Sequence, residues 1–230
     1  MNKRLQRVGI GLVLIGIAFF AAGGYTYIKT QEGASALNAF SAAQNVKLAY
    51  NDQGQLTDHG TTAGAAAIMS LLTNDWGYKV SASEMDPNDP LVNTASEYMY
   101  QMATISEHTL NAATTVTFPT DVVVDGKVVQ AAGTYDFQNT GKYYSGFDRT
   151  NLIEGAARDK VWTGTALALI GQLGVGSVTA SALQLGLGLA VLFALVGGTV
   201  VLTGLGLVWA TRPASEKVKA PAFRPVANPI

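Results

Sequence analysis

Two long apolar stretches frame the chain and determine its predicted architecture. From Val8 to Ile28, twenty-one residues carry no charge, and Arg7 and Lys29 bound this stretch. A second uncharged stretch of fifty-one residues runs from Val161 to Thr211. Because about 20 apolar residues in a helix cross the hydrocarbon core of a bilayer, each stretch predicts a transmembrane helix.

The second stretch is longer than one span requires. We predict the membrane helix at residues 183–211 and a surface or interfacial helix at 161–182, which breaks at Gly174 and Gly176. A third span is the alternative. It would place one basic tail outside, against the tendency of Lys and Arg to remain in the cytoplasm.

Residues 29–160, between the spans, have the mixed periodicity of a small α+β domain. Apolar side chains at intervals of three and four predict a helix over 91–112, and shorter helices are expected at 34–49 and 61–72. Asp125-Gly126 between β-branched runs predicts a β-hairpin, because this tight turn needs positive φ. The predicted fold is a mainly α membrane protein whose two transmembrane helices carry a small extracytoplasmic α+β domain with a β-hairpin.

Charge gives the predicted orientation. The segments 1–7 and 212–230 contain seven basic residues and one acid, a net +6, whereas the rest has eight basic and fifteen acidic residues, a net −7. Basic flanks remain cytoplasmic, so we expect a multi-pass protein of the cell membrane with both tails in the cytoplasm and the central domain outside. The N-terminal pattern also fits a secretory signal peptide, but we expect an uncleaved anchor.

The composition also limits the partners and the chemistry. Only 13% of residues are charged, against about 25% in an average soluble domain, which favours the lipid bilayer as a partner. The acidic central domain disfavours nucleic acid, because a phosphate backbone binds basic surfaces. The chain has no cysteine, which excludes disulfides and thiolate chemistry.

Small residues at every fourth position of the second span predict a helix-packing interface, because small side chains let helices approach closely in lipid. The first span, another integral membrane subunit or a second copy of the chain could occupy this face. The five positions are Ala182, Gly186, Ala190, Ala194 and Gly198.

Aromatic residues suggest a second contact surface. Aromatics with few charges around them are typical of interface cores, although they could equally form the core of the domain itself. The proline-rich, basic tail at 212–230 contains one further aromatic residue, Phe223, and a partner protein could hold this tail. The candidates for a partner surface are Tyr143, Tyr144, Phe147, Trp162 and Phe223.

The two histidines are the candidates for metal or acid–base chemistry. His59 follows Asp58, and His108 follows Glu107. Two imidazoles and a carboxylate form the open sites of zinc hydrolases and non-haem iron oxygenases. No ligand spacing such as His-x-x-x-His connects the two histidines, and phosphate-binding loops and a serine elbow are missing. We therefore predict no metal, no cofactor and no catalytic residue, and keep His59, His108 and Glu107 as candidate ligands.

Four segments of the chain are distinctive: residues 86–92 (DPNDPLV), 97–110 (EYMYQMATISEHTL), 147–158 (FDRTNLIEGAAR) and 179–181 (TAS) before the glycine-rich span. Together they resemble actinobacterial membrane proteins of uncharacterised function that have two spans and an extracytoplasmic domain. Some of those proteins are labelled aromatic ring-opening dioxygenase. Such dioxygenases are soluble enzymes with a metal triad, so we do not adopt the label. The resemblance implies an envelope protein that accompanies a larger membrane assembly.

Our leading hypothesis is a non-catalytic accessory subunit of a multi-subunit membrane oxidoreductase, either a respiratory complex or a membrane-bound hydrocarbon monooxygenase. The chain would stabilise or organise that assembly through helix packing and its outer domain, with other integral membrane subunits as partners. The alternative is a free-standing extracytoplasmic receptor or binding module for a small molecule or envelope component, which requires a concave apolar pocket. A third hypothesis is an enzyme that uses His59, His108 and nearby carboxylates.

Overall fold

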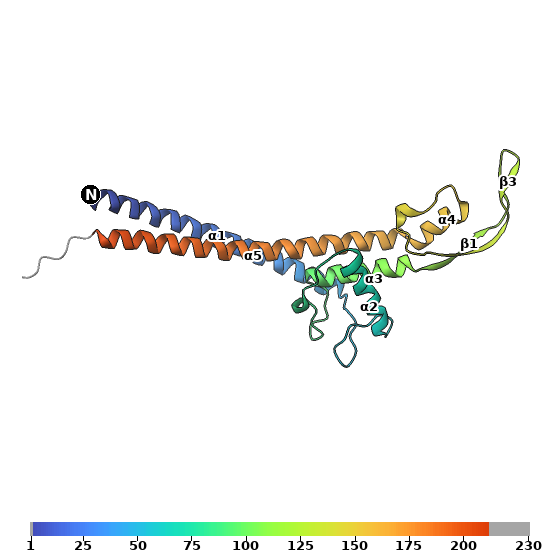
Figure 1. The fold of residues 1–230 in the computed structure, drawn as a ribbon, viewed down its shortest axis with the longest axis horizontal. Coiled ribbons are helices and arrows are strands. Elements are labelled where there is room, and N and C mark those ends of the chain that lie inside the picture. Colours follow the sequence, from blue (N-terminus) through green and yellow to red (C-terminus); the bar gives the residue numbers. More distant parts are fainter. Residues whose placement is uncertain (1, 212–230) are drawn as a thin grey trace, which may run out of the picture. The chain divides into compact units, whose positions relative to one another are not determined.

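The computed structural model describes residues 2–211, so the tail at 212–230, with Phe223, lies outside the described residues. The chain is mainly helical, and its two longest helices are α1, Asn2–Gln44, and α5, Gly164–Ala210 (Figure 1). It divides into two compact units. In the described part of the chain, residues 2–28 and 187–211 form a two-helix unit, and residues 29–186 form a central domain.

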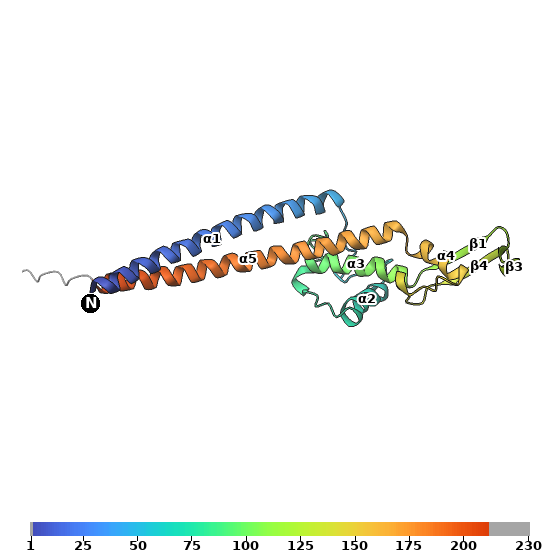
Figure 2. The ribbon, with the colours of Figure 1, turned by 90° about the horizontal axis from the view of Figure 1, so that it is seen from above.

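In the two-helix unit, α1 and α5 are each long and apolar enough to cross a membrane. The two helices run antiparallel and lie side by side in both views (Figures 1 and 2). Small residues form the contact at intervals of seven on each helix: a Cβ added to Gly9 would lie 2.8 Å from the Gly204 carbonyl oxygen, and one added to Gly16 would lie 2.8 Å from the Gly197 oxygen. A seven-residue repeat keeps one stripe facing its partner along both helices.

This contact differs from the predicted four-residue series. Of the predicted positions in the two-helix unit, Ala190 is buried, where it faces Gly23, whereas Ala194 and Gly198 are only partly buried. A step of four advances roughly 40° around a helix, whereas a step of seven falls short of two full turns by only about 20°. The four-residue series therefore follows the contact with α1 over its middle, where Ala190 and Ala194 lie against Gly23, and moves off the seven-residue stripe toward its ends. In the central domain, Ala182 is exposed and Gly186 lies against Thr30.

The main core of the central domain is built on α2, Thr62–Ser70, and α3, Ala95–Leu110. A π-helical turn, Leu71–Asp75, follows α2, and a short 3₁₀ helix, Ala82–Glu84, precedes α3. Thr94 and Glu97 form a reciprocal capping box that starts α3, which satisfies amide groups that have no partner within the helix. Ile68 and Leu72 are fully buried, and Leu173 of α5 joins the same core.

Two antiparallel ribbons and a short helix form the rest of the domain. Strand β1, Ala113–Phe118, pairs with β4, Gly133–Gln138, and β2, Val122–Val124, pairs with β3, Lys127–Gln130. The turn at Asp125-Gly126 has positive φ at both residues, so the predicted hairpin is confirmed. Helix α4, Leu152–Val161, packs on β1 and β4 (Figure 2), and a second core forms around Phe147 and Trp162.

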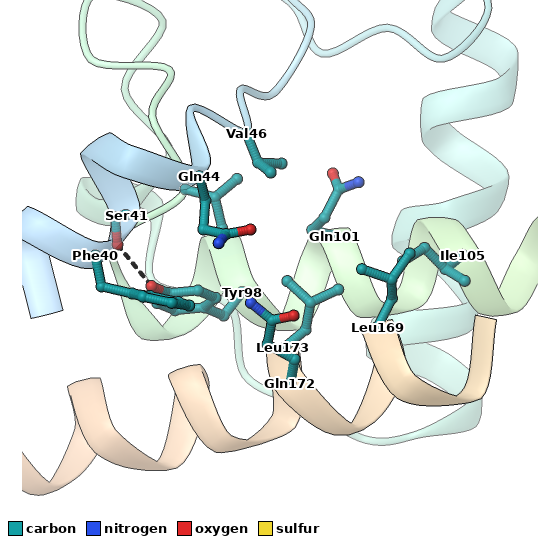
Figure 3. A pocket seen from close by; sticks show the side chains of 11 residues that line it. Phe40, Ser41, Gln44, Val46, Tyr98, Gln101, Ile105, Leu169, Gln172 and Leu173 are labelled. Atoms are coloured by element: carbon teal, nitrogen blue, oxygen red, sulfur yellow. Dashed lines mark hydrogen bonds between the residues drawn. The ribbon is translucent and has the colours of Figure 1, made fainter. Parts of the chain in front are cut away.

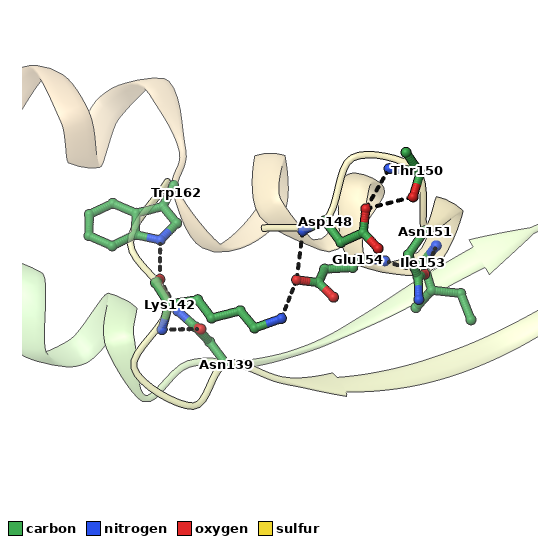
Figure 4. Close-up of polar contacts among 8 residues, drawn as sticks. All are labelled: Asn139, Lys142, Asp148, Thr150, Asn151, Ile153, Glu154 and Trp162. Carbon is green, nitrogen blue, oxygen red and sulfur yellow. Dashed lines mark hydrogen bonds and ion pairs between the residues drawn. The ribbon is translucent and has the colours of Figure 1, made fainter. Parts of the chain in front are cut away.

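A buried asparagine ties this second core together (Figure 4). The Asn139 amide nitrogen donates to the carbonyl oxygens of Thr109 and Lys142, at 2.9 and 3.0 Å, and its oxygen accepts from the Lys142 amide at 3.0 Å. The Trp162 indole donates to the same Lys142 carbonyl. The Lys142 ammonium pairs with Glu154, and this hydrogen bond, followed by one from the Asp148 amide, lowers the pKa of the Glu154 carboxyl.

The predicted break at Gly174 and Gly176 is wrong, because α5 is continuous from Gly164 to Ala210. The expected surface helix at 161–182 is therefore the start of α5, and α4 ends at Val161 just before it. A glycine costs a helix only about 1 kcal/mol. Here it makes room for a contact, since a Cβ on Gly176 would lie 2.6 Å from the Tyr98 ring.

Candidate metal centre and adjoining cavities

A tight turn at residues 58–61 positions the first two candidate ligands. The amides and carbonyls of Asp58 and Thr61 exchange two backbone hydrogen bonds, each 2.9 Å long. The central residues, His59 and Gly60, have φ of 47° and 77°. Such turns normally carry Asn-Gly or Asp-Gly, and histidine is, with Asn and Asp, one of the non-glycine residues enriched at positive φ. His59 therefore fits the turn, which fixes the position of its imidazole.

The neighbouring helices complete the arrangement. Thr61 caps α2 by accepting a hydrogen bond from the Gly64 amide. Gly64 leaves room for Asp58, since a Cβ there would lie 3.1 Å from the Asp58 Oδ2 atom. Helix α3 packs on α2 and places His108, in its last turn, beside the same carboxylate.

Three side chains converge at this point. The His108 Nε2 atom lies 2.9 Å from the Asp58 Oδ2 atom, and the His59 Nε2 atom lies 3.9 Å from it. One ligand atom of each residue lies within 4.8 Å of those of the other two. The side chain of Asp58 is 15% exposed, that of His108 is 38% exposed and that of His59 is 80% exposed. The carboxylate is thus held in place while both imidazoles remain accessible.

This geometry fits a divalent transition-metal ion. Ligand atoms at about 2.1 Å from a tetrahedral zinc ion are roughly 3.4 Å from one another. The two distances to Asp58 lie on either side of that value, and the centroids of the two imidazole rings are 4.8 Å apart. An ion held by all three residues would replace the present hydrogen bond between His108 and Asp58. Imidazole ligands favour zinc, iron, nickel or copper over calcium and magnesium. Three protein ligands would leave at least one coordination position open.

The structure changes the set of candidate ligands obtained from the sequence. It brings His59 and His108 together, although they are distant in the chain, and the third member is Asp58. Glu107 does not belong to the cluster; its carboxylate accepts a hydrogen bond from the Asn111 side chain at 2.9 Å. The sequence contains no local spacing motif for these residues, and tertiary packing is what brings them together. The available signal was a histidine, flanked by Asp and Gly, at the centre of a tight turn.

A cavity of about 190 Å³ adjoins the Asp58 side of the cluster, and its walls include Lys47, Thr57, Tyr100 and Gln101. Tyr100 is 2% exposed, and its hydroxyl has no hydrogen-bond partner among the described residues. Burial, with a further contribution from the negative charge of Asp58, raises the pKa of Tyr100 to about 12. The phenol is therefore a neutral hydrogen-bond donor at physiological pH.

A separate apolar cavity of about 130 Å³ lies between α1, α3 and α5 within the central domain (Figure 3). Phe40, Val92 and Leu173 contribute to its walls. The Tyr98 hydroxyl, which also borders it, is engaged by Ser41 at 2.7 Å. The walls are mainly apolar, so this is the kind of concave surface that a small-molecule binding module requires.

The aromatic residues predicted as a partner surface fall into two groups. Phe147 and Trp162 are each 4% exposed and belong to the core of the domain, so they are not available to a partner. Tyr143 and Tyr144 remain partly exposed, at 43% and 36%. Tyr143 stacks on Trp162 and its hydroxyl accepts a hydrogen bond from Trp76, while Arg158 lies over the Tyr144 ring.

Comparisons of the chain with protein-family models, with curated proteins and with solved structures found no match.

Proposed function

We propose that this chain is a membrane-anchored protein whose central domain binds one divalent transition-metal ion through Asp58, His59 and His108. The two apolar helices would serve as the membrane anchor, and their length and composition support this role. The basic residues at 1–7 and 212–230 support a cytoplasmic position for both ends and an extracytoplasmic position for the central domain.

The observation that carries the proposal is the convergence of the three side chains. They come from two segments about fifty residues apart, and one of them occupies a left-handed backbone position. The two hydrogen bonds of the turn fix this backbone, so the His59 imidazole is held beside the Asp58 carboxylate. A surface hydrogen bond between Asp58 and His108 alone would not need His59 at the turn.

Titration of the full-length protein in detergent, after treatment with a chelator, tests this proposal. We expect one equivalent of Zn²⁺ to bind in calorimetry, and one equivalent of Co²⁺ to give visible absorption bands. His108→Ala and His59→Ala should each weaken Zn²⁺ binding by a factor of at least about 100, because each removes a direct ligand and the loss of a residue that only supports a ligand already costs about 10- to 100-fold.

Glu107→Gln is the matched control, since Glu107 adjoins His108 in sequence but bonds to Asn111. This variant should bind Zn²⁺ as the native protein does. Zn²⁺ binding that is unchanged in both histidine variants would place the ion elsewhere and refute the assignment.

A second candidate function is the accessory subunit of a multi-subunit membrane oxidoreductase, in an actinobacterial envelope as the sequence resemblance suggests. The supporting observation is that Gly11, Gly24, Gly188 and Gly206 lie outside the α1–α5 contact, where an added Cβ would meet nothing within 4 Å among the described residues. Small residues that face lipid leave room for another helix.

Native mass spectrometry of the detergent-solubilised assembly tests this second function. Other integral subunits should accompany the chain in a fixed ratio, and Gly188→Leu should release them without disturbing the α1–α5 contact. Recovery of the native chain as a monomer after mild extraction would contradict it.

A further inference from the structure

The apolar cavity between α1, α3 and α5 in the central domain has the size of a single small ring (Figure 3). Its volume is about 130 Å³. An apolar cavity of about 150 Å³ holds one benzene molecule. A lipid acyl chain is much longer than such a ring and would leave most of its length outside the cavity. The volume therefore favours a molecule with one benzene-sized ring.

The inner wall of this cavity is apolar and held in place by its neighbours. Phe40, Leu173 and the Tyr98 ring contribute to it. The Tyr98 hydroxyl is bonded to the buried Ser41 hydroxyl at 2.7 Å, and the Tyr98 ring lies so close to Gly176 that a Cβ there would come within 2.6 Å of it. Because the two hydroxyls satisfy each other, the inner wall offers a ligand mainly rings and aliphatic carbon.

The outer part of the lining is polar but carries no charge. Gln44, Gln101 and Gln172 border the cavity, one from each of the three helices. Gln44 and Gln172 are exposed and Gln101 is partly buried. The eleven residues that line the cavity include no charged residue, so an ionised ligand would lose hydration without gaining an opposite charge. Amide groups can donate to and accept from an uncharged polar group, so the lining favours neutral ligands.

We infer that this cavity binds a neutral molecule with one benzene-sized ring and one small uncharged polar group, such as a hydroxyl. The ring lies against Phe40, Tyr98 and Leu173, and the polar group bonds with the glutamine amides at the opening. The inference goes beyond the proposed metal binding and does not depend on it, because none of the three candidate ligands lines this cavity.

Methyl NMR of the full-length protein in lipid nanodiscs tests the inference, because an aromatic ring shifts the resonances of the methyl groups beside it. Ile105 lines the cavity and is the reporter, whereas Ile170 packs against the second core and is the control. The probe is benzyl alcohol, compared at neutral pH with benzoate and benzylammonium, which are similar in shape but charged. We expect benzyl alcohol to shift the Ile105 methyl resonances saturably without shifting those of Ile170, and both ions to bind at least about tenfold more weakly.

A pair of substitutions on α5 locates the binding. Leu169→Trp should weaken benzyl alcohol binding about tenfold, because Leu169 lines the cavity and the larger side chain occupies space that the ligand needs. Leu167→Trp is the matched control, since Leu167 is 39% exposed and Leu169 is 40% exposed, but Leu167 does not line the cavity. The control variant should bind benzyl alcohol as the native protein does.

Several results would overturn the inference. Ile105 resonances that do not shift, or that shift without saturation and equally with those of Ile170, would show that benzyl alcohol only dissolves in the bilayer. Equal affinities for the three probes, or for the native and Leu169→Trp proteins, would place the binding outside this cavity. Cross-peaks between the Ile105 methyl groups and lipid chains that benzyl alcohol does not displace would identify a lipid as the occupant.

Discussion

Gly197→Leu should force the two apolar helices apart, at a cost of about 3 kcal/mol for the overpacked contact. A Cβ at this position would lie 2.9 Å from the Gly16 carbonyl oxygen and 3.1 Å from the Phe20 amide nitrogen. Both are backbone atoms, which cannot rotate away as a side chain can. The helices can accommodate a leucine only by moving apart by roughly 2 Å. This is the range over which the distance between packed helix axes varies with the size of the contacting side chains.

Electron spin resonance on a pair of labels measures this separation. The chain has no cysteine, so Ile10→Cys and Leu202→Cys give unique attachment points, and both positions are well exposed at 49% and 71%. Gly188→Leu on the same helix is the control, because nothing lies within 4 Å of its added Cβ. Identical distance distributions for Gly197→Leu and Gly188→Leu would show that the glycine contact does not hold the helices together.

Asn139→Ala should destabilise the second core of the central domain by about 3 kcal/mol. The substitution removes hydrogen bonds to the Thr109 carbonyl and the Lys142 amide. Asn139 is only 1% exposed, so water cannot readily replace these bonds. The Lys142 carbonyl keeps its bond from Trp162. Hydrogen exchange of the amides in β4 and α4 measures the effect, which should appear as faster exchange in both elements.

Asn74→Ala provides the comparison for Asn139. Asn74 is exposed, and its side chain makes one hydrogen bond, 3.0 Å long, to Ser70. Water can replace that bond, so the stability should change by less than about 0.5 kcal/mol. Equal effects of the two substitutions would mean that the Asn139 network adds nothing beyond an ordinary surface contact.

Periodicity in the sequence was sufficient to predict most of the local elements. The uncharged stretches predicted both long apolar helices, the three-and-four spacing around Tyr98 predicted α3, and Asp125-Gly126 predicted the hairpin. Strand β4 was not predicted, although Tyr135 and Phe137 alternate with polar residues there.

Glycine was the main source of error in the apolar helices. Gly174 and Gly176 suggested a break where α5 is continuous, and the four-residue series covers only part of the contact with α1. A glycine in sequence does not distinguish a helix end from a position where another element approaches closely. The contacts of Gly176 with Tyr98 and of Gly16 with Gly197 show that these glycines make room for a neighbouring element. Both are tertiary contacts, which the sequence does not reveal.

The candidate metal centre depends on tertiary structure in the same way. Metal-binding motifs with fixed spacing arise where one helix or loop supplies several ligands. Here the turn at His59 and the end of α3 supply them separately, so the packing of α2 on α3 creates the cluster. The residue types were evident from the sequence, but their proximity was not.

The left-handed turn at His59 also makes natural variation informative. For the backbone alone, Asn or Gly at this position would serve as well as His or better. Orthologous chains that need only the turn should therefore diverge to Asn-Gly or Gly-Gly. Lineages in which position 59 stays His, and changes together with position 108 when it does change, would record selection for the imidazole pair.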